Sequence, residues 1–177
     1  MGGRTLRNKR GVSGVIVTVL LIALAVVIIA IVWAVIMNLV EENVDSTKAC
    51  FGNFNKVTLN KRYTCYDSTD QTVDFSVNVG DIEIDEVIVL VSGAGTTKSV
   101  KLASEASNMD YLKPYGGVWN GSVTSPGENS GKTYVLNLTK AGIGGLPDLI
   151  KISPVIEGTQ CESSDSITNL EPCETIA

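Results

Sequence analysis

Four cysteines are the residues of this chain with the clearest capacity for chemistry. They stand at Cys50, Cys65, Cys161 and Cys173, with no Cys-x-x-Cys spacing of the kind that structural zinc sites use. The chain has no histidine, which removes most general-base, Ser-His and His-metal chemistry. Disulfides are therefore favoured over free buried thiols. Of the three possible connectivities we expect the local pairs, Cys50 with Cys65 and Cys161 with Cys173, each contributing about 3 kcal/mol.

A glycine-rich segment from Gly127 to Thr133 (GENSGKT) superficially suggests a phosphate-binding loop. Such a loop needs four residues between its two glycines and a helix after its Ser or Thr. Here there are three intervening residues, Pro126 stands where the glycine is required, and a strand pattern follows. Nucleotide binding is not expected, and Gly142–Pro147 is interpreted as a turn.

Acidic residues alternate at Asp81, Glu83 and Asp85, and another pair stands at Asp67 and Asp70. Carboxylates on one strand face could chelate calcium. A solvated acidic face explains both groups better. We expect no metal, cofactor or catalytic residue, and no enzymatic activity.

Two sequons offer candidate N-glycosylation acceptors, Asn120 in Asn-Gly-Ser and Asn137 in Asn-Leu-Thr. In a strand over 134–139, Asn137 would point away from Leu136 and Leu138, toward solvent.

A long apolar run begins near the N-terminus and dominates the composition. No charged residue lies between Arg10 and Glu41, and residues 15–37 are interrupted only by Thr18. A helix of this length spans roughly 45 Å, more than the ~30 Å hydrocarbon core of a bilayer. The run also lacks the polar stripe of a helix packed on a soluble domain. It therefore predicts a membrane-spanning helix over 12–40.

The charges on either side of the run set its orientation. The four basic residues that precede it are Arg4, Arg7, Lys9 and Arg10. All 19 acidic residues and the other ten basic ones follow it, so a leader of +4 precedes a head of −9. The positive-inside rule keeps the leader in the cytoplasm and places the head outside, where paired cysteines are expected. An acidic head offers no surface for nucleic acid.

Residues 41–177 carry strand patterns separated by turn signals. Thr72–Val79 alternates apolar and polar residues as a half-buried strand does. We predict an all-β immunoglobulin-like sandwich, with a surface loop over 105–130 and a short helix around 103–111. The expected strands cover residues 56–63, 72–79, 82–91, 98–102, 133–139 and 149–156.

The junction between leader and helix carries a more specific signal. Lys9-Arg10-Gly11 is followed by Val12 and a continuous apolar helix. This arrangement resembles the class III signal sequence of archaeal type IV pilins, which a prepilin peptidase cuts after the glycine on the cytoplasmic side. The resemblance covers about residues 8–40. It implies that Gly11–Val12 is the scissile bond, that Lys9 and Arg10 are read by the peptidase, and that residues 1–11 are removed.

The chain differs from two related families, and these differences make the resemblance more specific. Bacterial type IV pilins usually carry a glutamate at the fifth mature position, where this chain has Ile16. Archaellins tend to continue with a glycine-rich segment, whereas this chain continues Val15-Ile16-Val17-Thr18. An archaeal pilus is favoured over a bacterial pilus and over an archaellum.

The resemblance implies a structural function. The chain would be the subunit of an extracellular filament used for adhesion or cell contact, held in the cytoplasmic membrane before assembly. Its partners would be other copies of itself in a helical homopolymer, the prepilin peptidase, an assembly ATPase and a membrane platform protein.

Two other functions stay open. One is a minor pilin or tip adhesin whose loop over 105–130 binds a target through Tyr111, Tyr115 and Trp119, although burial of these rings is preferred. The other is an uncleaved single-pass surface binding protein.

Overall fold

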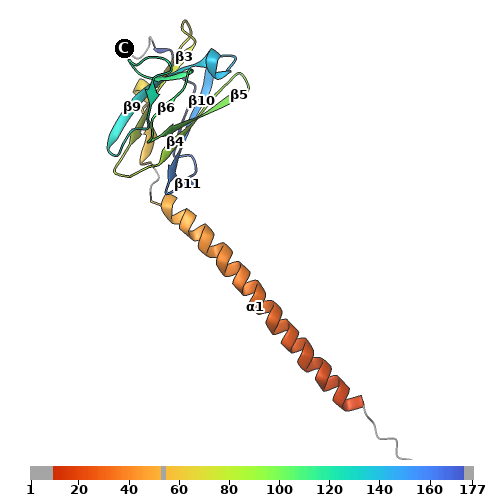
Figure 1. The fold of residues 1–177 in the computed structure, drawn as a ribbon. Helices are drawn as coiled ribbons and strands as arrows, with labels where there is room; N and C mark the ends of the chain where they lie inside the picture. The colour runs from red at the N-terminus through yellow and green to blue at the C-terminus, as the bar shows by residue number, and fades with distance from the viewer. Residues whose placement is uncertain (1–9, 53–54, 174–177) are drawn as a thin grey trace, which may run out of the picture. The chain divides into compact units, whose positions relative to one another are not determined.

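The computed structural model describes residues 10–52 and 55–173. The chain divides into two compact units, Met1–Asp45 and Ser46–Ala177. The described part of the first is helical, and we refer to the second as the head. Figure 1 shows the helix and the strands of the head.

One long helix, α1 (Arg10–Cys50), has 41 residues. The predicted apolar helix is confirmed, but it extends ten residues beyond the expected end at Val40. No glycine or proline interrupts residues 41–50, so nothing in the backbone stops the helix there. Gly52 follows with a φ of 96°, a left-handed conformation that glycine adopts without strain and that commonly terminates helices.

The head is mostly β, and its paired strands are antiparallel in two five-stranded sheets. The first sheet runs in the order β1 (Val57–Leu59), β3 (Thr72–Val79), β9 (Ser130–Asn137), β7 (Leu112–Pro114), with β2 (Cys65–Asp67) also paired to β3. The second runs β11 (Thr159–Gln160), β10 (Pro147–Ile156), β4 (Glu86–Gly93), β5 (Thr96–Ala103), with β12 (Asp165–Thr168) on β10. A two-stranded pair joins β6 (Ser107–Asn108) to β8 (Ser122–Val123).

Both sheets contribute to one hydrophobic core. Alternation along β3 sends Val73, Phe75 and Val77 into this core, all fully buried. The Phe75 ring stacks on the buried Tyr134 of β9, with ring centroids 5.4 Å apart. Val79 follows the same alternation into the core, which leaves Thr72, Asp74, Ser76 and Asn78 on the outer face of the first sheet.

The predicted strands are found, with shifted ends. Thr72–Val79 matches β3, while the strand predicted over 133–139 ends at Asn137 and gives way to a short helix, α2 (Leu138–Ala141). The strand predicted over 56–63 stops at Leu59 and is followed by a 3-10 turn, η1 (Lys61–Tyr63).

The prediction for residues 103–130 was wrong in two respects. The helix expected around 103–111 is absent, and β6 lies there instead. The expected surface loop contains β7 and β8, whose Leu112 and Val123 are fully buried. These two apolar residues stand in a run rich in Gly, Ser and Asn. Because an isolated buried residue gives no periodicity, the sequence did not predict strands there.

Candidate functional site: the apolar helix, the disulfides and the outer face of the head

The apolar segment of α1 exposes every large side chain that it carries. From Val15 to Val40 the exposed fractions range from 43% at Met37 to 65% at Ile29. Its polar Thr18 is satisfied within the helix, because its hydroxyl donates to the Val15 carbonyl at 2.8 Å. A helix that is apolar on all sides and internally hydrogen-bonded suits a lipid or protein interior and not water.

Length and composition agree with this requirement. Gly14–Val40 forms a helical stretch of 27 residues that is long and apolar enough to cross a membrane. At 1.5 Å per residue it measures about 40 Å, against a hydrocarbon thickness of about 30 Å.

The predicted processing site lies at the N-terminal end of this helix. Lys9 falls outside the described residues, and Arg10, Gly11 and Val12 are the first three residues of α1. The first turn of a helix has N–H groups with no intrahelical partner, so it opens more easily than the interior. A peptidase acting at Gly11–Val12 would need that opening.

All four cysteines form disulfides, and the described residues include no free cysteine. The predicted local pairing was wrong. Cys50 is bonded to Cys161, with Cα atoms 5.4 Å apart, and Cys65 to Cys173, with Cα atoms 4.9 Å apart. Each bond joins the beginning of the head to its end, across 111 and 108 residues.

Chain pairing around β2 explains the second bond. The Tyr66 N–H donates to the Glu171 carbonyl at 3.0 Å, and Tyr66 forms a parallel bridge with Pro172. The C-terminal segment therefore runs beside β2, and Cys173 comes within reach of Cys65. Loop entropy alone favours short loops, and these backbone contacts override it.

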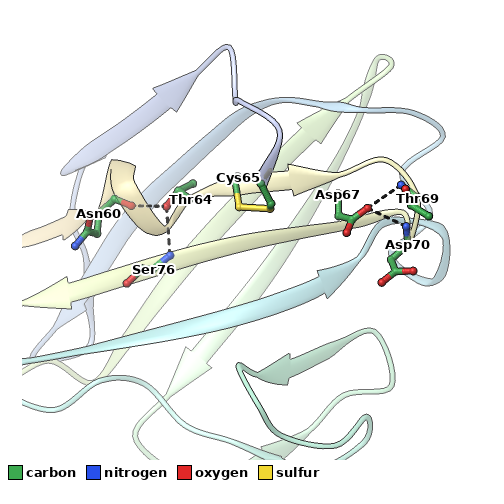
Figure 2. Close-up of a disulfide and its surroundings, with 8 residues drawn as sticks. Asn60, Thr64, Cys65, Asp67, Thr69, Asp70 and Ser76 are labelled. Atoms are coloured by element: carbon green, nitrogen blue, oxygen red, sulfur yellow. Dashed lines mark hydrogen bonds between the residues drawn. A yellow bond between two sulfur atoms is a disulfide. The ribbon is translucent and has the colours of Figure 1, made fainter. Parts of the chain in front are cut away.

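Hydrogen bonds hold both flanks of Cys65, as Figure 2 shows. On one side, the Thr64 hydroxyl donates to the Asn60 carbonyl at 2.8 Å and accepts from the Ser76 N–H at 3.3 Å. On the other, Asp67 Oδ1 accepts from the N–H groups of Thr69 and Asp70. Asp67 therefore stabilises the β2–β3 turn as an Asx turn, and this local structural role accounts for it without a metal.

Asp74 on β3 lies within 4.8 Å of both sulfurs of the Cys65–Cys173 bond. Two sulfurs and a carboxylate at this spacing look like a metal-binding cluster. A disulfide sulfur is not a thiolate, however, and the thiolate is the species that binds metals. Burial raises the pKa of Asp74, repulsion from Asp67 raises it further, and Lys113 partly opposes the shift.

The alternating acidic residues do not share a strand face, because they precede β4. Asp81 pairs with Lys56, whose hydrogen bond lowers the pKa of this exposed carboxyl. Asp85 Oδ2 accepts from the Gly158 N–H at 2.7 Å. These two carboxylates have protein partners, so the arrangement gives no support to a calcium site.

The two sequons differ in their surroundings. Asn120 is exposed, with a φ of 58°, in the turn closed by the Gly121 N–H and the Val118 carbonyl. Asn137 is half-buried and caps α2, accepting from the Lys140 N–H at 2.8 Å. Leu136 and Leu138 are buried while Asn137 is partly exposed, as the alternation predicted. The strand ends at Asn137, however, and its side chain begins a helix.

The glycine-rich segment has a structural role. The Ser130 hydroxyl donates to the Gly127 carbonyl, and β9 begins at Ser130, within the segment. Lys132 donates to Thr124 Oγ1 at 2.6 Å. The segment thus runs into a strand, as expected, where a phosphate-binding loop requires a helix.

The aromatic residues between β6 and β8 are not buried as a group. Tyr115 is 70% exposed, and Tyr111 is partly buried against the core. Trp119 is half-buried, with the ammonium groups of Lys113 and Lys140 at 4.7 and 5.5 Å from its ring centroid. The preferred burial of all three rings was therefore wrong for Tyr115.

Sequence reasoning overlooked a set of polar and aromatic residues on the outer face of the first sheet. Asp74 and Asn78 alternate with core residues on β3, and Arg62 and Tyr63 stand in η1 beside it. The alternation was visible, but it predicted only a half-buried strand.

Comparison with models of known protein families, with curated proteins and with solved structures gives no match.

Proposed function

We propose that this chain is the structural subunit of an archaeal type IV pilus-like surface filament, cleaved by prepilin peptidase and polymerised through α1. The observation that carries the proposal is the surface of α1 between Gly14 and Val40, which is apolar and exposed all round. Such a helix needs lipid before assembly and other copies of itself afterwards.

The free energy of burying the aliphatic side chains of α1 indicates how assembly would be driven. Between Val12 and Val40 the chain has 19 Val, Ile and Leu residues. At about 2 kcal/mol for each buried aliphatic side chain, they favour a nonaqueous environment by roughly 40 kcal/mol. Lipid already satisfies most of this term, so moving the helix into a filament core gains little by itself. We therefore expect an assembly ATPase and a membrane platform protein as partners.

The head supports an extracellular location. Two disulfides each tie its beginning to its end, as befits a domain exposed to an oxidising medium and to proteases. We infer that its two antiparallel sheets on one core form an immunoglobulin-like sandwich. In a fibre built by repeated contacts that do not close, such heads would surround the helical core.

The test is the N-terminus of the protein recovered from the surface of cells that contain a prepilin peptidase, measured by mass spectrometry. We expect the chain to begin at Val12. A Lys9→Gln/Arg10→Gln variant should remain uncleaved, whereas the control Arg4→Gln/Arg7→Gln keeps the adjacent basic pair and should be processed. A wild-type chain beginning at Met1 or Gly2 would refute the pilin proposal.

A binding role is the second candidate, either as a minor tip adhesin or as an uncleaved membrane-anchored surface protein. The exposed Tyr115 favours it, because large exposed aromatics are enriched in recognition surfaces. Abundance separates the two filament roles. A major subunit would dominate sheared filaments, and a tip adhesin would be a trace component.

A further inference from the structure

The outer face of the first sheet forms a groove of about 520 Å³, which we call the tyrosine groove. Its lining includes the side chains of Arg62, Tyr63, Asp74, Asn78, Tyr115 and Thr133. The Cys65–Cys173 disulfide also lines it.

The floor of the tyrosine groove follows from strand pairing. On β3 and β9, Ser76 is opposite Thr133 and Asn78 is opposite Gly131, with their neighbours Val77 and Tyr134 in the core. A Cβ at Gly131 would lie 2.3 Å from Asn78 Oδ1, so the glycine leaves the space in which the Asn78 amide lies. The floor is thus a row of hydroxyl and amide groups on two rigid strands.

The walls come from opposite sides of these two strands. Tyr63 belongs to η1, which is tied to β3 by the hydrogen bond from the Asn60 N–H to the Ser76 carbonyl. Tyr115 follows β7 and donates its N–H to the Thr133 carbonyl at 2.9 Å, which places it beside β9. Tyr63 is 55% exposed and Tyr115 is 70% exposed. Such rings offer large apolar faces that lose little conformational entropy on binding.

The polar groups of the tyrosine groove have unused hydrogen-bonding capacity. Asp74 is half-buried, yet its carboxylate makes no hydrogen bond or ion pair with any residue that the structure describes. Within the same described part, the guanidinium of Arg62 and the side-chain amide of Asn78 also lack such partners. A partly desolvated carboxylate without donors is unfavourable, so a ligand that brings hydroxyl donors would relieve it.

The chemistry of the tyrosine groove restricts the class of ligand. One cation, Arg62, and one anion, Asp74, balance each other and favour a neutral ligand. Little free strand edge is left here for a peptide, because β3 is paired on both sides and β9 is paired with β7 over Tyr134–Leu136, beyond which the Tyr115 N–H donates to the Thr133 carbonyl. What remains is a molecule with many hydroxyls, which both donate and accept, and with apolar C–H faces that stack on aromatic rings.

We propose that the tyrosine groove binds a neutral oligosaccharide, with Tyr63 and Tyr115 stacking on the sugar rings and Arg62, Asp74 and Asn78 bonding to hydroxyls. The site deepens the adhesive role proposed above by giving it a ligand class. Binding resides in the head, however, and does not require the chain to be cleaved or polymerised.

The test uses the full-length chain in lipid nanodiscs, because detergents with sugar headgroups would compete. Cellohexaose, mannohexaose and chitohexaose serve as probes in calorimetric titrations and in NMR saturation-transfer measurements. We expect at least one of the three to bind. Tyr115→Ala and Asp74→Asn should each weaken that binding by about tenfold or more.

The matched control is Phe51→Ala, which removes another exposed aromatic, 77% accessible, that does not line the tyrosine groove. This variant should bind as the wild type does. Thermal unfolding of each variant shows that the head remains folded, so that loss of binding is assigned to the groove.

Three results would overturn the proposal: no binding of any probe at millimolar concentration, binding that survives both groove variants, or binding only of sulfated or uronic-acid saccharides added to the panel. The N-terminal measurement is independent of all three. An unprocessed chain that binds a hexasaccharide would refute the pilin proposal and keep the groove, and a processed chain that binds none would do the reverse.

Discussion

Removing the Cys65–Cys173 disulfide tests the crossed pairing and its contribution to stability. The perturbation is the double variant Cys65→Ser/Cys173→Ser. Considered alone, this bond closes a loop of 108 residues, and the chain-entropy relation assigns it about 4.8 kcal/mol.

The other disulfide shortens that loop. With Cys50–Cys161 intact, the path from Cys65 runs about 15 residues back to Cys50, crosses the bond, and continues about 12 residues from Cys161 to Cys173. The effective loop is therefore about 27 residues, for which the same relation gives about 3.5 kcal/mol. For a head of this size we expect the midpoint of thermal unfolding to fall by about 10–15 °C.

The assay is thermal unfolding of the full-length chain in nanodiscs, followed by far-ultraviolet circular dichroism in the β-sheet region. A matched control is Cys50→Ser/Cys161→Ser, which opens an effective loop of the same length and should lose a similar amount. Removing all four cysteines should cost about 8 kcal/mol, more than twice the cost of removing either pair. Once one bond is absent, the bond that remains closes its full long loop and therefore contributes more to stability.

Titration of free thiols in denaturant distinguishes the crossed disulfide pairing from the local pairing. If Cys50 is bonded to Cys161, the variant lacking Cys65 and Cys173 has no free thiol. Under local pairing the same variant would have two. Two thiols would contradict the crossed connectivity. So would a quadruple variant no less stable than either double variant, because under local pairing each double variant already lacks both bonds.

Three further substitutions address the interior and the outer face of the head. Tyr134→Phe removes the hydrogen bond from the Tyr134 hydroxyl to the Thr124 carbonyl (2.6 Å) and should cost about 1 kcal/mol; burial raises the pKa of Tyr134, so wild-type stability should fall as the pH rises above 10, and the variant should lose that dependence. Gly93→Ala places a Cβ 2.5 Å from the Leu146 carbonyl oxygen and should cost about 1–3 kcal/mol in denaturant unfolding. Asp74→Asn should stabilise the head at neutral pH while weakening saccharide binding. Because the pKa of Asp74 is raised above 3.8 in the folded state, its carboxyl contributes stability below pH 3.8 that is lost as the pH rises through the folded pKa, so the advantage of the variant should shrink in acid.

Controls for these substitutions come from the same chain. Gly127→Ala meets no atom closer than 3.9 Å and should be nearly neutral, unlike Gly93→Ala. If the stability of Tyr134→Phe also falls as the pH rises above 10, the alkaline loss of stability belongs to another group. An Asp74→Asn variant less stable than the wild type at neutral pH would show that the carboxylate has a stabilising partner.

Local features of the sequence determined which segments form helix and strand. The uncharged run between Arg10 and Glu41 predicts a long apolar helix because its composition leaves no polar stripe. The alternation in Thr72–Val79 predicts β3 to the residue, since a two-residue period is a property of the strand itself. An even number of cysteines and no histidine likewise predicted disulfides without any knowledge of the fold.

The tertiary structure alone decided which distant residues meet. Cys173 reaches Cys65 because the C-terminal segment runs beside β2, a contact that depends on the path of more than a hundred intervening residues. Asn137 became a helix cap only because β9 ends there. The tyrosine groove likewise joins η1, β3 and the residue after β7, segments that carry no shared pattern along the chain. Sequence periodicity records the face on which each residue of one element lies, whereas a site built across several elements depends on how those elements pair.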